Sequence, residues 1–157
     1  MAASRDETPT APPWLVAIAA WAMPGLGHVL IGQAWRGIAV GAAVLGLFIG
    51  GLLIGGVRVV DPPGYQDGRR LETRDGSWVL LSRPVGSMVS RPWFVAQVLN
   101  GPVAIAAGAG NVAAARAGYA KPTARLADIG TLYCAAAGMM NLIAVMDAAS
   151  RAAGRES

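Results

Sequence analysis

The composition of the chain separates it from ordinary soluble domains. Of its 157 residues, 54% are hydrophobic and 14% are charged, whereas an average soluble domain carries about 25% charged residues. The 13 lysine and arginine side chains form no basic stripe and no aromatic platform accompanies them, which excludes nucleic-acid binding. The single cysteine excludes an internal disulfide.

Four long stretches contain no Asp, Glu, Lys or Arg. A helix of roughly 20 apolar residues crosses the ~30 Å hydrocarbon core of a bilayer, and each stretch is near that length: Thr8–Trp35, Gly37–Val57, Pro92–Ala115 and Ile129–Met146. We therefore predict an all-α membrane protein with about four transmembrane helices. Its expected surroundings are the lipid bilayer of a bacterial cytoplasmic (inner) membrane.

The same pattern divides the chain into five parts. We expect a disordered N-terminal lead at 1–13, a helical pair at 14–57, an extramembrane loop at 58–91, a second helical pair at 92–149, and a polar tail at 150–157.

The first apolar stretch could also be a signal peptide. Arg5 precedes it, and Ala20-Trp21-Ala22 imitates a cleavage site. However, Asp6 and Glu7 offset the positive charge that the start of a signal peptide needs. Apolar residues also continue beyond Pro24 as far as Ile31, which favours a retained helix. Pro24 cannot donate a backbone hydrogen bond, so it predicts a break in that helix.

The second stretch carries three pairs of glycines spaced four residues apart. Small residues at this spacing line one helix face and allow a neighbouring backbone to approach closely. The face either packs within the chain, which we favour, or forms a contact with a second copy or with another membrane protein. The pairs are Gly37/Gly41, Gly46/Gly50 and Gly51/Gly55.

The loop and the third stretch carry weaker signals. Asp75-Gly76 lies between two short segments, Leu71–Arg74 and Ser77–Leu81, and predicts a two-residue β-hairpin. The third stretch is rich in Ala and Gly and contains Asn100 and Asn111, so a re-entrant segment is the alternative to a full span.

Charge does not fix the orientation of a four-span chain. Both termini and the 58–91 loop would share one side, which holds nine lysine and arginine residues against four on the other. Counting alone places that loop in the cytoplasm. The other four residues lie in tight turns beside the membrane, which favours the opposite orientation.

No motif predicts catalysis, a cofactor or a metal. Gly108–Ala113 matches a dinucleotide fingerprint, and Asp128 follows Gly108 by twenty residues, but a turn stands where the second strand is required. His28 and Cys134 have no carboxylate in their own stretches. We expect His28 to bond a backbone carbonyl that Pro24 leaves open, without binding metal.

Several polar residues fall at membrane depth or at helix ends. Such groups usually bond across helices inside a bundle, so structural cross-linking is the favoured role and a polar path for a small solute is the alternative. They are His28, Gln33, Gln97, Asn100, Asn111 and Asn141, with Asp128 and Asp147 at helix ends.

The start of the chain resembles the helix–turn–helix signature of TM2-type membrane domains. The residues that carry the resemblance are Pro24, Gly25, Gly27, His28, Gly32, Arg36 and Gly37. The resemblance implies that the turn at Arg36 is cytoplasmic, and with four spans the 116–128 turn would join it there.

The last helix resembles that of a small uncharacterised membrane family found mainly in planctomycete bacteria. The similar residues are Asp128–Tyr133, Gly138, Asn141 and Asp147. Together with the Pro24–His28 start, the resemblance covers nearly the whole chain. It implies a four-helix membrane protein of unknown function.

These observations favour a non-enzymatic membrane protein that acts in interaction or assembly. An oligomeric channel or transporter for a small solute, built around Asn100 and Asn111, is the first alternative. An intramembrane enzyme, in which His28 works with a residue from another helix, is the second.

Overall fold

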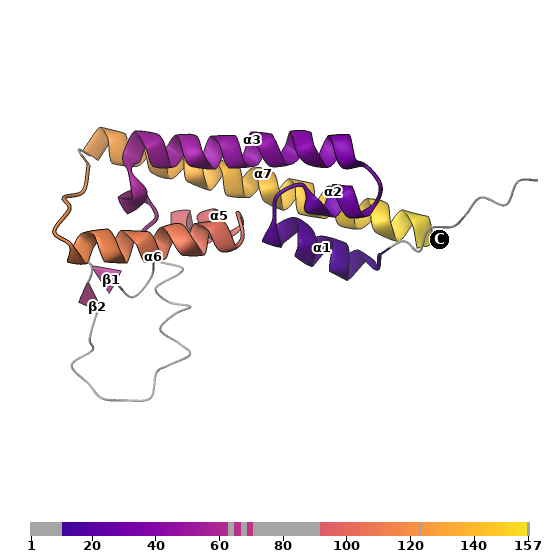
Figure 1. The fold of residues 1–157 in the computed structure, drawn as a ribbon, viewed down its shortest axis with the longest axis horizontal. Coiled ribbons are helices and arrows are strands. Elements are labelled where there is room, and N and C mark those ends of the chain that lie inside the picture. Colours follow the sequence, from indigo (N-terminus) through magenta and orange to yellow (C-terminus); the bar gives the residue numbers. More distant parts are fainter. Residues whose placement is uncertain (1–10, 63–64, 67–68, 71–91, 123, 157) are drawn as a thin grey trace, which may run out of the picture.

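The computed structural model describes residues 11–62, 65–66, 69–70, 92–122 and 124–156 (Figure 1). These residues form six α-helices and one short 3₁₀ helix, with two paired strands of two residues each. The helices are α1 (Pro13–Ala22), α2 (Leu26–Leu30), α3 (Ala34–Gly55), η1 (Val57–Val59), α5 (Pro92–Val98), α6 (Pro102–Arg116) and α7 (Ala124–Glu156); the strands are β1 (Tyr65–Gln66) and β2 (Arg69–Arg70).

The expected β-hairpin at Asp75-Gly76 lies outside the described residues. The strands that the structure does describe lie earlier in the loop. β1 and β2 pair antiparallel, with Tyr65 opposite Arg70 and Gln66 opposite Arg69. The described part of the chain is otherwise helical, as the sequence predicts.

The antiparallel helices α3 and α7 form the long axis of the molecule (Figure 1). Glycines bring their backbones together. A Cβ atom added to Gly51 would lie 2.7 Å from Cys134 Sγ and 2.8 Å from the Gly130 carbonyl oxygen, and one added to Gly130 would lie 2.7 Å from the Gly51 carbonyl oxygen. Because no real Cβ fits at such distances, this crossing requires glycine on both helices.

The first apolar stretch breaks at Pro24, as predicted. α1 ends at Ala22, the chain reverses through a turn in which Gly25 has φ = 89°, and the five-residue α2 runs back beside α1. Gly25 lies against the backbone of Gly37, at the start of α3. The described part of the first stretch is therefore a helical hairpin, α1 and α2, and not one continuous helix.

The third stretch is also a hairpin. α5 has seven residues and α6 has 15, and between them Gly101 turns the chain with φ = 79°. Neither stretch forms one continuous helix in the described residues, so the expectation of four helices of membrane length is wrong for the first and third stretches. Among the described helices, two are long and apolar enough to cross a membrane, Ala34–Gly55 and Arg125–Gly154.

The two hairpins approach the middle of α7 from opposite ends (Figure 1). α1 begins beside Ala148 and Ala152 of α7, whereas the α5 residue Phe94 lines a cavity with Ala127 and Leu132. Their turns meet near Asn141, whose side chain reaches both. The half-length helices thus fill one side of the α3–α7 pair from its two ends.

This arrangement separates two turns that four spans would place on one side. Arg36, at the start of α3, lies beside Asp147 near the end of α7. Gly55, at the end of α3, lies beside Leu126 at the start of α7. The Arg36 turn and the 116–128 connection therefore lie at opposite ends of the molecule, which corrects the four-span prediction.

The Gly51 contact can be tested by alanine substitution, with the adjacent Gly50 as the control position. Gly51→Ala places a Cβ against Cys134 and Gly130, and such overpacking costs about 1–3 kcal/mol. Gly50→Ala meets nothing within 4 Å and removes a helix-weakening glycine, so it is neutral or stabilising by about 0.5–1 kcal/mol. Thermal unfolding in mild detergent should separate the two variants, and equal melting temperatures would contradict this packing.

Candidate functional site

Three motif residues meet at the end of the molecule where α2 returns. His28 is 1% exposed, and its Nε2 lies 3.0 Å from Asp147 Oδ2. Arg36 Nη2 lies 3.3 Å from the same oxygen, and Arg151 Nε donates to Asp147 Oδ1 at 2.9 Å. One carboxylate of α7 thus holds the imidazole of α2, the guanidinium at the start of α3, and a cation one turn further along its own helix.

The glycines of the Pro24–His28 motif make this contact geometrically possible. A Cβ on Gly27 would lie 2.7 Å from Ala20 Cβ and 2.9 Å from the Val16 carbonyl oxygen, so α2 can lie this close to α1 only with glycine there. Gly37 in turn lies against Gly25 and Val29. The motif therefore places His28 at the side of α7.

The expectation that His28 bonds an open backbone carbonyl is wrong. Its partner is the Asp147 carboxylate, 119 residues further along the chain. Helical periodicity cannot reveal a contact between two helices so far apart in sequence. The available signal was that His28 lies in the start that resembles TM2-type domains and Asp147 in the last helix, which resembles that of the uncharacterised membrane family. The carbonyl of Ala20, which Pro24 leaves open, lies instead 3.5 Å from Asn141 Nδ2.

The chemistry available to His28 follows from this pairing. The imidazole Nε2 donates to the carboxylate, which orients the ring as carboxylates do for catalytic histidines. The other nitrogen, Nδ1, is buried and has no hydrogen-bond partner in the described part of the chain. The described residues include no group of three or more His, Cys, Asp or Glu that could hold a metal ion.

A second polar cluster lies where the hairpin turns meet. Asn141 Nδ2 donates to the Leu99 carbonyl at 2.8 Å as well as reaching Ala20, and Asn100 Nδ2 donates to the carbonyls of Gln97 and Cys134, both at 3.0 Å. Both asparagines are fully buried. The predicted role of buried amides as cross-links between helices holds for these two.

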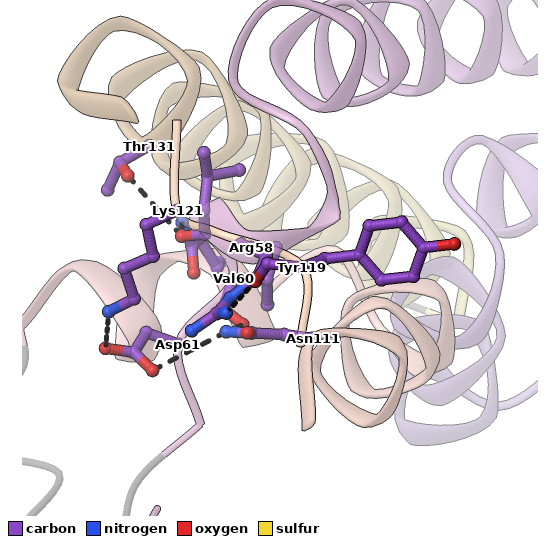
Figure 2. Close-up of polar contacts among 9 residues, drawn as sticks. Arg58, Val60, Asp61, Asn111, Tyr119, Lys121 and Thr131 are labelled. Carbon is purple, nitrogen blue, oxygen red and sulfur yellow. Dashed lines mark hydrogen bonds and ion pairs between the residues drawn. The ribbon is translucent and has the colours of Figure 1, made fainter. Parts of the chain in front are cut away.

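A third cluster occupies the opposite end, around the chain that follows α3 (Figure 2). Asn111 of α6 donates to the Val60 carbonyl at 2.7 Å, and Asp61 pairs with Lys121 at 3.4 Å. Arg58 donates to the Tyr119 carbonyl, and Thr131 Oγ1 lies 3.4 Å from the Val59 carbonyl oxygen. These contacts join the start of the loop to α6, to α7 and to the connection between them.

A cavity of about 460 Å³ adjoins this third cluster. Asp128, one of the predicted helix-end acids, lines it together with Arg58, Gln97, Lys121 and Thr131, and Trp93 and Phe94 supply aromatic walls. Asn111, which the sequence grouped with Asn100, instead lies at this end of the molecule. The candidate residues are thus divided among three places, and Gly32 only forms the turn before α3, with φ = 77°.

The role of Asp147 can be tested against Asp128, an exposed acid near the other end of the same helix. Asp147→Asn removes the negative charge and leaves one acceptor oxygen for the three donors His28, Arg36 and Arg151, and losing a hydrogen bond to a buried group costs about 1–3 kcal/mol. We expect its melting temperature in detergent to fall, whereas that of Asp128→Asn stays near the wild type. Equal effects of the two substitutions would show that Asp147 does not fasten α2.

Comparison with known proteins places the chain in a family without a known activity. No curated protein and no solved structure matches the chain. A model of a family of unknown function, DUF6677, matches residues 15–157, which include all three polar clusters. The expectation of an uncharacterised family that covers nearly the whole chain is thereby confirmed, and the family description names neither an activity nor a membrane. The chain belongs to the family of unknown function DUF6677.

Proposed function

We propose that the chain is an integral membrane protein of the bacterial inner membrane, with two spanning helices and two re-entrant hairpins. The surface of the long helices supports this. Leu53 of α3 is 81% exposed, and Ile143 and Met146 of α7 are 67% and 63% exposed. Apolar side chains this exposed along two helices of membrane length suit lipid better than water.

The hairpins fit the same setting. Non-helical backbone at membrane depth is tolerated where it is buried in protein, and the turn residues Pro24, Gly25, Asn100 and Gly101 are all buried. Exposed tryptophans begin α1 and α5, Trp14 and Trp93, at opposite ends of the bundle. Tryptophan is enriched at both membrane–water interfaces, so each would mark one surface.

With two spans, the charges divide nine to four, as they do with four spans, but the basic residues of the 116–128 connection now lie on the same side as those of the 58–91 loop. Nine lysine and arginine residues belong to the segments between α3 and α5 or around the start of α7; the other four lie in the N-terminal lead, at the start of α3 and at the end of α7. The positive-inside rule then places the 58–91 loop and the 116–128 connection in the cytoplasm. The Arg36 turn and both termini face the other side.

This topology is testable with two single cysteines in a Cys134→Ser background. Trp35 and Tyr119 are 82% and 70% exposed, at opposite ends of the molecule. In intact spheroplasts, an impermeant maleimide should label Trp35→Cys, whereas Tyr119→Cys should react only after lysis. Four full spans would place both positions on one side, so labelling of both or of neither in intact cells would contradict two spans.

Within the membrane, we propose a non-enzymatic role in assembly, through one face of α3. Two of the three glycine pairs on α3 are used inside the chain: Gly37 and Gly41 contact the α1–α2 turn, and Gly51 and Gly55 contact α7. A Cβ on Gly46 or Gly50 would meet nothing within 4 Å. This is the observation that carries the proposal, since lipid-embedded helices associate through small residues that allow close backbone approach.

The neighbours of this pair give the face its character. Ala39, Ala42 and Ala43 are exposed one and two turns before Gly46, and Ile49 and Leu53 border the far end. The face is therefore shallow and apolar, and a second helix could lie along it without meeting a charge. A second copy of the chain is the partner tested first.

The Gly46 face can be tested with a matched pair of substitutions. Gly46→Leu together with Gly50→Leu fills the face and should weaken self-association in detergent or bilayers roughly tenfold, or about 1.4 kcal/mol. Ala136→Leu adds the same side chain at an exposed position of α7 and should change nothing. Energy transfer between labelled copies at increasing lipid dilution measures the difference.

Two results would contradict this proposal. One is self-association of the double variant with the affinity of the wild type. The other is a wild type that stays monomeric at every dilution and brings no other membrane protein through purification that the double variant loses.

A further inference from the structure

The two halves of the described chain follow the same plan. Each contains a short helix, a turn with a positive-φ glycine next to a proline, a returning helix, and a long helix. The first unit is α1, α2 and α3; the second is α5, α6 and α7. Each unit also begins with nearly the same five residues, Pro13-Trp14-Leu15-Val16-Ala17 and Pro92-Trp93-Phe94-Val95-Ala96.

The two units are inverted relative to each other. α3 and α7 run antiparallel, and α1 and α5 enter from opposite ends of the bundle (Figure 1). In membrane proteins with inverted repeats, the binding site lies near the midplane, where discontinuous helices of the two repeats meet. Here the turns meet beside Gly138 and Asn141, close to the centre of the apolar stretch Arg125–Gly154.

Direct contacts join the two turns. Trp21 Nε1, at the end of α1, donates to the Val98 carbonyl at the end of α5, at 3.2 Å. Gly101 lies against the Trp21 carbonyl, and Asn141 reaches one carbonyl from each turn. We name this region, formed by Trp21, Asn100, Gly101, Gly138 and Asn141, the midplane seam.

The midplane seam contains two buried oxygen atoms that still need donors. Asn100 Oδ1 and Asn141 Oδ1 are buried and have no partner in the described residues, although both Nδ2 atoms are bonded. Gly138 lies beside Asn100, since a Cβ there would be 3.0 Å from Asn100 Nδ2, and Asn141 follows three residues later along α7. Buried acceptors without donors are rare in native proteins and indicate a missing ligand, water or ion.

We propose that residues 13–55 and 92–154 are inverted copies of one unit, and that the midplane seam binds a small molecule that donates hydrogen bonds to the Asn100 and Asn141 oxygens. The acceptors are neutral carboxamide oxygens, and the residues that form the seam include no basic side chain. They suit a donor that is uncharged or positive and exclude an anion. Water and ammonium share this chemistry, and the experiment distinguishes them.

Labelling at asparagine gives a simple spectrum, because the chain contains three asparagines, at 100, 111 and 141. In bilayer-reconstituted protein labelled at asparagine with ¹³C and ¹⁵N, solid-state NMR should show transfer from water protons to the carboxamide carbons of Asn100 and Asn141. If the site prefers ammonium, adding ¹⁵N-ammonium replaces this transfer by a cross-peak between the ammonium nitrogen and the same two carbons, which its ¹⁵N shift separates from the carboxamide's own nitrogen.

Two variants localise the effect. Asn141→Leu should abolish the transfer to Asn100, because the two oxygens share one molecule. Asn111→Leu, at the far end of α6, should leave both signals unchanged. If Asn141→Leu does not fold, the water and ammonium experiments on the wild type still decide whether a donor occupies the midplane seam.

The proposal fails if neither water nor ammonium protons reach the two carboxamides in the wild type, or if Asn141→Leu folds and leaves the Asn100 signal intact. The inference relies on the membrane placement proposed above only for the depth of the seam. The NMR result concerns the seam itself, whereas the maleimide result concerns the topology, so a failure of one is distinguishable from a failure of the other.

Discussion

Backbone carbonyls at two helix breaks impose the constraint on which the rest of the fold depends. A break leaves carbonyl groups without their helical donors, and where they are buried in the protein their partners must come from other parts of the chain. Asn141 supplies a donor at both breaks, since its amide nitrogen reaches the Ala20 carbonyl beside the first turn and the Leu99 carbonyl of the second. One side chain at the middle of α7 therefore fixes where both hairpins stop.

The ends of the hairpins need their own fastening, because a short helix has little stability of its own. At one end, the Asp147 carboxylate holds His28 of α2 and Arg36 of α3. At the other, Asn111 of α6 bonds the Val60 carbonyl at the start of the loop (Figure 2). The histidine motif and the scattered amides, which look unrelated in the sequence, thus do the same thing: they fasten the short helices to the long ones at both ends and in the middle of the molecule.

The sequence predicted the features that depend on local chemistry. It predicted that Pro24 breaks its helix, and that the charge-free stretches that form α3 and most of α7 are helical. For the Pro92–Ala115 stretch, which reverses at Gly101, it favoured a full span and kept a re-entrant segment as the alternative, because the apolar content of a stretch does not show whether the chain turns back within it. It also misassigned His28, since the choice between a nearby carbonyl and Asp147 is decided by how α2 packs on α7. Such long-range packing leaves no periodic signal in one sequence.

The glycines of α3 show how one sequence pattern can serve different contacts. All three pairs have the same spacing, so the sequence treats them alike. The fold separates them: Gly37 and Gly41 receive the first hairpin, Gly51 and Gly55 receive α7, and Gly46, with Gly50, receives nothing from the described residues. Because the first and last pairs are occupied, a partner that used the middle pair would join the bundle without displacing any internal contact. Assembly and folding could therefore use the same helix independently.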